Sequence, residues 1–252
     1  MKALITGASS GIGREIAIYL SKLGCDLILV ARNREKLEEI QKELLTKSRI
    51  IVMDLSNEQK VKELYVLTHK DDIDILINNA GFGLCGDFNS LELSKELEMI
   101  NTNIKCVHIL TKAFLRDFIK KDKGYILNVA SSAGLMPGGP LMATYYATKS
   151  YVISFTNSIW YELKKKKSHV HISALAPGPV NTNFNNVANV NFSVKPLEAD
   201  MVARYAINKM LKNKRLIIPG ISMKLSNFFK RFVSEKFMLK TAYRVQRKKI
   251  TK

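Results

Sequence analysis

Long apolar runs are missing from this sequence of 252 residues. No stretch approaches the roughly 20 consecutive apolar residues that a membrane-spanning helix requires. A strand-like pattern, KALIT, already begins at residue 2, which leaves no room before it for the charged and apolar regions of a signal peptide. We therefore expect a cytoplasmic protein.

Potential metal ligands and disulfides are also scarce. The three cysteines, Cys25, Cys85 and Cys106, lack the spacing of a metal site, which predicts reduced and mostly packed thiols. His169 and His171 alternate on one predicted strand, but no third ligand with suitable spacing accompanies them, and a catalytic zinc site needs three protein ligands. We expect no bound metal and interpret the two histidines as solvated or packed side chains.

Acidic residues are nearly absent from residues 201–252, which contain 15 of the 40 Lys and Arg residues but only one of the 22 acids, Glu235. Residues 1–200 are close to balanced, so the net charge of +18 lies mainly in a basic tail. The run KKKK at 164–167 ends a predicted helix, where cations complement the helix dipole. Neither feature requires a nucleic acid as partner, and we expect none.

Strand-like and helix-like patterns alternate through most of the chain. Stretches with helical periodicity, such as 14–22 and 34–45, lie between short apolar runs, and Ser56 and Gln59 have the spacing of a capping box that starts a helix. Such alternation indicates an α/β fold, a Rossmann-like doubly wound parallel sheet with helices on both faces. The predicted strands are 3–6, 26–31, 49–54, 73–79, 124–130 and 170–176.

A single domain over residues 1–252 is expected for this length and fold class. We predict a dinucleotide-binding and catalytic core at 1–185, and a substrate loop with a basic helical C-terminal segment at 186–252. The apolar positions of that segment follow helical spacing, with basic residues on other faces. They are Ile221, Leu225, Phe228, Phe229, Phe232 and Val233, flanked by Lys224, Lys230 and Arg231.

Two interpretations of these basic helices remain open. They can cover the substrate mouth as a lid or pack along a partner subunit, as apolar stripes ordinarily do. They can also lie on an anionic membrane surface as basic amphipathic helices. Both interpretations suit an apolar or lipid-like substrate.

A glycine-rich turn, TGASSGIG at residues 6–13, follows the first predicted strand and precedes a predicted helix. Glycines let the backbone approach a pyrophosphate closely, and the N-terminus of the helix offers free N–H groups and the positive end of a dipole. In this context the turn favours a dinucleotide-binding site over a merely structural turn.

The end of the second strand indicates which dinucleotide is bound. An acid at this place commonly binds the ribose hydroxyls of the adenosine, but this chain has Ala31 followed by Arg32, Asn33 and Arg34. An arginine can pair with a ribose 2′-phosphate, and no carboxylate is there to repel that phosphate. NADP(H) is therefore favoured, although Arg32 could also be only a solvated surface charge.

Together with TYYATKS at 144–150, these motifs resemble the short-chain dehydrogenase/reductase family over about residues 1–185. In MINTNIK the flanking pattern selects Asn103 rather than Asn101. In NVASSAG the distance to the glycine favours Ser131, whereas the separation from the tyrosine favours Ser132. The matches, in the family's order, are Gly7, Gly11 and Gly13, Asn78 to Gly81, Asn103, Ser131, Tyr145 with Lys149, and Pro177 with Gly178.

The chemistry of the family requires an acid that protonates the alkoxide left by hydride transfer. A phenol with a pKa of about 10 is too weak an acid for easy exchange. Tyr145 and Lys149 are four residues apart and share a helix face, so the ammonium is expected to lower the pKa of the phenol. Tyr146 faces Ser150 by the same spacing and is expected to pack or to border the pocket.

The resemblance implies four catalytic residues: Asn103, Ser131, Tyr145 and Lys149. It implies that Asn103 holds a water relay, that Asp54 contacts the adenine and that Thr182 meets the nicotinamide carboxamide. Each motif alone could be a structural turn. The residues expected to bind the cofactor are Gly7, Ser9, Ser10, Gly11, Ile12, Gly13, Arg32, Asn33, Asp54, Leu55, Asn79, Ala80, Gly81, Tyr145, Lys149, Pro177, Gly178, Val180 and Thr182.

The sequence therefore predicts an NADP(H)-dependent oxidoreductase that interconverts a carbonyl and a secondary alcohol, assembled as a homodimer or homotetramer. Two alternatives belong to other classes. One is a non-catalytic NADP(H)-binding sensor, against which the intact Ser, Tyr and Lys set argues. The other is a membrane-surface protein that acts through its basic C-terminal helices.

Overall fold

The computed structural model describes residues 1–182 and 196–250 of the chain. Its centre is a parallel sheet of seven strands in the order β3-β2-β1-β4-β5-β6-β9. The strands are β1 (Lys2–Thr6), β2 (Asp26–Ala31), β3 (Ser48–Val52), β4 (Ile75–Asn78), β5 (Gly124–Val129), β6 (Val170–Leu175) and β9 (Leu216–Ile217). The six predicted strands are all present.

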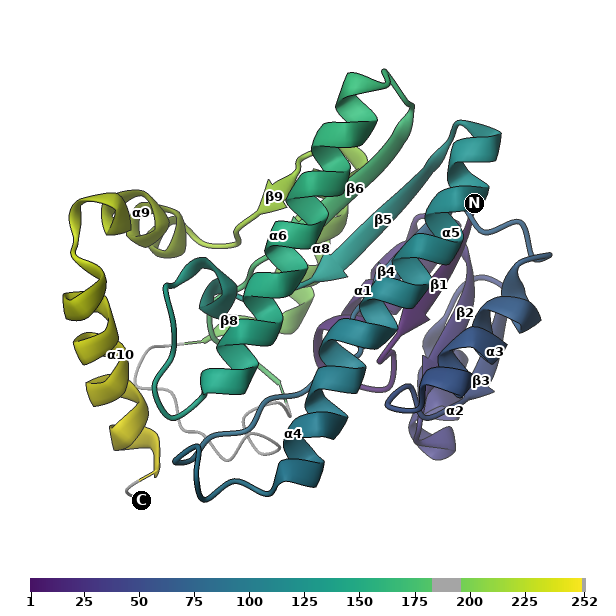
Figure 1. Ribbon diagram of the computed structural model, residues 1–252. Helices are drawn as coiled ribbons and strands as arrows, with labels where there is room; N and C mark the ends of the chain where they lie inside the picture. The colour runs from purple at the N-terminus through teal and green to yellow at the C-terminus, as the bar shows by residue number, and fades with distance from the viewer. Residues whose placement is uncertain (183–195, 251–252) are drawn as a thin grey trace.

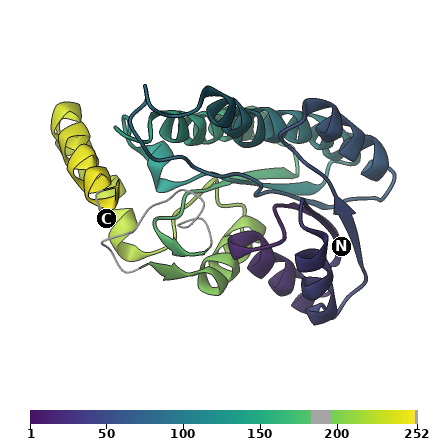
Figure 2. The same ribbon diagram turned by 90° about the horizontal axis from the view of Figure 1, so that it is seen from below.

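Helices cover both faces of the sheet (Figures 1 and 2). One layer consists of α1 (Gly11–Lys22), α2 (Arg34–Glu43) and α8 (Ala199–Leu211). The other consists of α3 (Glu58–Thr68), α5 (Val107–Lys121) and α6 (Ala143–Lys165), with α4 (Leu93–Ile100) leading into α5. The predicted doubly wound α/β fold is confirmed.

The central strands are apolar throughout because both faces of each are covered. All four residues of β4 are buried, and side chains from α5, such as Phe114 and Phe118, pack against one face. From β1 the chain proceeds to β2 and β3 on one side, and β4 then starts the other half on the opposite side of β1. Ligands bind beyond the carboxyl ends of parallel strands at such a switch point.

Two features of the fold differ from the sequence predictions. The capping box at Ser56 is wrong: α3 begins at Glu58, and the side chain of Asn57 accepts the capping hydrogen bond from the Lys60 N–H at 3.1 Å. The Ser56 N–H instead donates to the Asp54 carboxylate at 3.0 Å. The sheet also continues beyond residue 185, because β9 pairs with β6 and α8 packs against α1.

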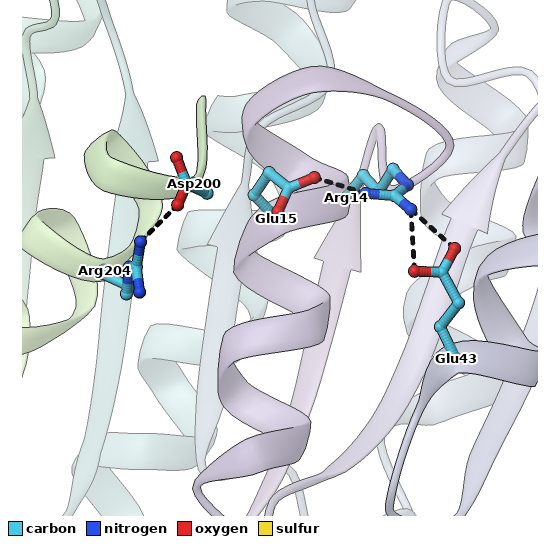
Figure 3. A network of polar contacts seen from close by, with 5 residues as sticks. All are labelled: Arg14, Glu15, Glu43, Asp200 and Arg204. Carbon is cyan, nitrogen blue, oxygen red and sulfur yellow. Dashed lines mark hydrogen bonds and ion pairs between the residues drawn. The ribbon is translucent and has the colours of Figure 1, made fainter. Parts of the chain in front are cut away.

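Ion pairs tie the outer helices together near the glycine turn (Figure 3). Arg14 in the first turn of α1 donates to both carboxylate oxygens of Glu43, at 2.6 and 2.8 Å, and also pairs with Glu15. Asp200 and Arg204 form a separate pair along α8. These pairs are partly exposed, so each contributes at most about 1 kcal/mol. The pair of Arg14 with Glu43 joins the start of α1 to the end of α2.

The C-terminal segment forms two helices that stand at the edge of the sheet body (Figures 1 and 2). They are α9 (Ile221–Phe229) and α10 (Glu235–Ile250), joined by a short turn of 3-10 helix, η3 (Lys230–Phe232). The predicted basic helical segment is therefore present. Within residues 1–182 and 196–250, no helix is long and apolar enough to cross a membrane. The predicted substrate loop falls largely on residues 183–195, outside the described part.

Candidate active site

A cavity of about 730 Å³ opens at the carboxyl ends of the strands, on the switch point between β1 and β4. It is lined by most of the residues predicted to bind a cofactor, together with Ser131, Tyr145 and Lys149. Gly13 and Asn103 do not line it. A cavity in this position has the size and location of a dinucleotide and substrate site.

The glycine turn forms a cradle that side chains would fill. Gly7 has a φ of +65°, and a Cβ there would lie 2.8 Å from the Cα of Ala80. Gly11 has a φ of +55°, and a Cβ there would lie 3.0 Å from the Thr182 side chain. Helix α1 starts with no side-chain cap on its free N–H groups. The turn therefore fits a pyrophosphate bound by backbone N–H groups.

Gly13 does not line the cavity, and its cofactor contact stays a prediction. A Cβ at this position would lie 2.3 Å from the Gly7 carbonyl oxygen and 2.4 Å from the Asn79 amide nitrogen. Gly13 therefore lets α1 pack closely against the turn, and it acts on the site through the backbone of Gly7.

The predicted NNAG segment holds the glycine turn in place. The Asn79 amide donates to the carbonyl oxygens of Thr6 and Gly7 at 3.1 and 3.0 Å. In return, the Thr6 hydroxyl accepts from the N–H groups of Asn79 and Ala80. These four bonds fix the ends of β1 and β4 relative to each other, while Asn79, Ala80 and Gly81 still line the cavity.

Two cations line the cavity where β2 ends. Arg32 pairs with Glu98 at 3.2 Å but remains 66% exposed, and Lys36 in the first turn of α2 lies on the same wall. Sequence reasoning missed Lys36, although its place four residues after Arg32 was a usable signal. The Asn33 side chain caps α2 by accepting from the Lys36 N–H at 2.7 Å. Asn33 therefore orients this wall as well as lining it.

Tyr145 lies in the first turn of α6 and is only 8% exposed. Burial raises the pKa of its phenol to about 12, and a hydrogen bond with Ser131 is the largest opposing effect. The expectation that Lys149 lowers this pKa is not met: the pKa of the phenol is raised, and burial is the largest cause. The phenol of Tyr145 is consequently protonated and neutral at pH 7.

Lys149 is one helical turn further along α6, with its ammonium nitrogen 5.9 Å from the Tyr145 ring centre. The ammonium donates to the Val129 carbonyl oxygen at 3.0 Å, and burial lowers its pKa to about 8. Ser131 follows β5, and its hydroxyl accepts from the Ala133 N–H at 3.1 Å. The end of β5 and one face of α6 thus bring the three predicted catalytic side chains together.

Asn103 lies behind this cluster in a π-helical turn, η1 (Asn101–Cys106), between α4 and α5. Its fully buried amide donates to the Phe82 carbonyl oxygen and the Thr148 hydroxyl, at 2.9 and 3.1 Å. A Cβ on Gly81 would lie 2.7 Å from the Asn103 side-chain oxygen and 3.4 Å from the Lys149 nitrogen. Asn103 is therefore a close neighbour of the cluster, and π-helical turns are frequent at functional sites.

A family model described as short chain dehydrogenase matches residues 1–191. This match spans the glycine turn, the cluster around Tyr145 and the strand ends that line the cavity. The chain belongs to the short-chain dehydrogenase family. The predicted membership is confirmed.

Individual short-chain dehydrogenases support the same conclusion. An NADP-dependent 3-hydroxy acid dehydrogenase of Schizosaccharomyces pombe is 34% identical over 234 residues, which cover 85% of this chain and 88% of the relative. The structure of a short-chain dehydrogenase from Sphingobium yanoikuyae in complex with NADPH matches with a TM-score of 0.82 at 26% identity, over 92% and 93% of the two chains. A bulky-bulky ketone specific alcohol dehydrogenase from Comamonas testosteroni gives a TM-score of 0.78 at 26% identity, over 92% and 91%.

The remaining wall of the cavity in this short-chain dehydrogenase was not predicted in detail. It comes from the loop before α6 and from α10. Tyr146, expected to pack or to border the pocket, lines this wall. The new residues include Met136, Met142, Phe237, Met238, Val245 and Gln246.

Proposed function

We propose that the protein is an NADP(H)-dependent oxidoreductase that interconverts a carbonyl and a secondary alcohol on an apolar substrate. Membership of the short-chain dehydrogenase family makes it an oxidoreductase acting on CH–OH groups. The observation that carries the proposal is the contact of Ser131 with Tyr145 beside Lys149, at the base of a cavity whose other end is the glycine cradle.

NADP(H) is the proposed cofactor because the glycine cradle suits a pyrophosphate and the wall beyond β2 carries Arg32 and Lys36. The relative from Schizosaccharomyces pombe is NADP-dependent, and the Sphingobium structure contains NADPH. Arg32 and Lys36 would hold the 2′-phosphate, Asp54 and Leu55 would flank the adenine, and Thr182 would meet the carboxamide. The bound cofactor supplies or accepts the hydride.

Side chains of the protein itself donate the proton to the substrate and accept it back. In the direction of carbonyl reduction, Tyr145 donates its phenolic proton to the substrate oxygen, while the Ser131 hydroxyl donates a hydrogen bond to the same oxygen. The Lys149 ammonium stabilises the phenolate that results. We assign Asn103 the role of holding a water next to Lys149 that returns the proton.

Replacement of one hydroxyl tests this assignment and separates it from a non-catalytic sensor. Tyr145→Phe is expected to lower kcat for ketone reduction by at least about 100-fold, because it removes only the proton donor, and to leave the NADPH dissociation constant within about threefold. Tyr161→Phe, on the exposed face of the same helix, is the control. Equal rates for wild type and Tyr145→Phe over a panel of ketones would contradict the assignment.

The cofactor preference has its own matched pair of variants. Arg32→Ala should weaken NADPH binding about tenfold or more and leave NADH binding nearly unchanged, since a charge-assisted pair to the phosphate is lost. Arg34→Ala, which removes an exposed arginine that pairs with Glu38 outside the cavity, should change neither constant. Tighter binding of NADH than of NADPH by the wild type would overturn the preference.

A second candidate function is contact with an anionic membrane through α9 and η3. None of the residues of these elements is buried, and Ile221 and Phe232 are each 76% exposed, with Phe228 and Phe229 beside them. Residues 221–247 contain seven Lys or Arg and one acid. A second copy of this surface would repel it, whereas a leaflet with anionic lipids is complementary in both charge and apolarity.

Vesicle sedimentation tests the membrane contact. The variant Phe228→Ser/Phe232→Ser should bind vesicles of phosphatidylcholine and phosphatidylserine about tenfold more weakly than the wild type, because two exposed rings are lost. Phe88→Ser, at a phenylalanine that is 67% exposed far along the chain, is the control. Equal binding by both variants, or none by the wild type, would contradict this function.

Two further expectations complete the proposal. A homodimer or homotetramer follows from the family resemblance, and sedimentation equilibrium measures it directly. A cytoplasmic location is supported by Cys25 and Cys106, which are buried thiols and form no disulfide. Fractionation of cells that express the tagged full chain tests that location and would detect a membrane-bound pool.

A further inference from the structure

Tyr146 and Gln246 meet inside the cavity although 100 residues separate them. The Gln246 amide, on α10, donates to the Tyr146 hydroxyl at 2.9 Å. Gly139 makes room for the phenol, since a Cβ there would lie 2.3 Å from the Tyr146 ring. Gln246 is 3% exposed, so its amide is buried beside Tyr146, the residue that follows Tyr145 in the chain.

This pair has unused hydrogen-bonding capacity. The side-chain oxygen of Gln246 is buried and finds no hydrogen-bond partner among residues 1–182 and 196–250, and an orphaned buried acceptor costs about 1–3 kcal/mol. While the Tyr146 oxygen accepts from Gln246, its own proton is available to donate. If the amide is turned over, the phenol donates to Gln246 and the free groups become the amide N–H and a phenol lone pair. Either orientation offers one donor and one acceptor.

The surroundings of the pair are apolar and uncharged. Met142 and Cys85 belong to the same apolar cluster as Tyr146, and Phe237 and Val245 of α10 line the cavity. The charged side chains among the described lining residues are Arg32, Lys36, Asp54 and Lys149, which belong to the cofactor wall or to the catalytic cluster. A carboxylate on the substrate would find no cation here, whereas a neutral polar group would find both partners it needs.

We propose that Tyr146 and Gln246 form a substrate subsite that binds a neutral group able both to donate and to accept a hydrogen bond, a hydroxyl or a primary amide. This group lies on the apolar body of the carbonyl substrate, away from the reacting carbon. The inference rests on the proposed oxidoreductase function, and it narrows the substrate class to neutral hydroxy ketones or keto amides.

Matched ketones test the subsite. Rates of NADPH oxidation are measured with 2-decanone and with hydroxydecan-2-ones that carry the hydroxyl at successive carbons. The wild type should prefer at least one hydroxylated ketone over 2-decanone by about tenfold or more in kcat/KM, mainly through KM. Gln246→Met should bring this ratio close to one. Gln59→Met, at an exposed glutamine of α3, should leave every ratio unchanged.

A binding measurement keeps the subsite testable without turnover. Calorimetric titration with decanamide, in the presence of NADP+, should give at least about tenfold tighter binding to the wild type than to Gln246→Met, with Tyr146→Phe also weakened. Thermal melts of the variants establish that they fold.

Equal decanamide affinity in wild type and Gln246→Met, or no hydroxyl preference among ketones that are reduced, would overturn the subsite. Failure to reduce any ketone, with decanamide discrimination intact, would overturn the oxidoreductase function and leave the subsite standing.

Discussion

Replacing Lys149 by methionine should inactivate the enzyme and at the same time stabilise the fold. The Lys149 ammonium is buried, and its pKa falls from 10.5 to about 8 because burial disfavours the charged form. A depression of this size corresponds to about 3 kcal/mol of lost stability when the lysine is protonated in both states. Methionine is similar in length and carries no charge, so it removes this penalty.

The opposing effect is the loss of the hydrogen bond to the Val129 carbonyl oxygen. An unpaired buried carbonyl costs about 1–3 kcal/mol, so the variant should be more stable than the wild type by up to about 2 kcal/mol at pH 7. Urea denaturation followed by circular dichroism measures this difference. Lys166→Met, at the exposed end of α6, is the control and should stay within about 0.5 kcal/mol of the wild type.

The pH dependence identifies the cause. Below pH 8 both folded and unfolded chains hold the Lys149 proton, and the folded protein bears the full penalty. Between pH 8 and 10.5 the unfolded chain binds more protons, so wild-type stability rises with pH relative to the variant. The advantage of Lys149→Met should therefore shrink and reverse by pH 10.5. A variant that is less stable than the wild type at pH 7, by an amount independent of pH, would refute this reasoning.

Three other predictions follow from single contacts. Gly13→Ala places a Cβ 2.3 Å from the Gly7 carbonyl oxygen, and it should destabilise the fold by about 1–3 kcal/mol and weaken NADPH binding, as seen by urea denaturation and fluorescence titration. Asn128→Leu removes the hydrogen bonds of Asn128 to Asn78 and Thr156, which keep only their bonds to Thr111 and to the Val152 carbonyl oxygen, and it should lower the free energy of unfolding by about 2–3 kcal/mol with an unchanged m-value. Burial raises the pKa of the Cys106 thiol to about 12, so in the native protein iodoacetamide at pH 8 should leave Cys106 unlabelled by mass spectrometry while unfolding exposes it.

The cofactor half of the cavity could be predicted from sequence because its residues are set by local patterns. The glycines follow β1 directly, and helical spacing alone puts Tyr145 and Lys149 on one face of α6. Parallel strands then place all their carboxyl ends at one edge, so separate motifs meet without further information. Fold class and family both followed from these short-range features.

Properties set by the surroundings were not predictable in this way. Ser56 and Asn57 both offer an oxygen that can cap a helix, and the path of the chain after β3 selects Asn57. The pKa of Tyr145 is governed by how completely the rest of the chain buries it, which residue spacing does not encode. Gly13 carries the family's motif, yet its contact is with Gly7 and not with the cavity.

The substrate half of the cavity is lined by α10, a helix with few buried side chains. Among the described side chains of α9, η3 and α10, Gln246 is the buried one, and it is polar. The inner face of α10, with Phe237 and Val245, instead borders open cavity. An apolar substrate would fill that space and bury these side chains against the body, which stabilises the docked helix by mass action. Under the proposed function, substrate binding and docking of α10 would therefore be coupled, and the Tyr146–Gln246 pair would make that coupling sensitive to the polar group on the substrate.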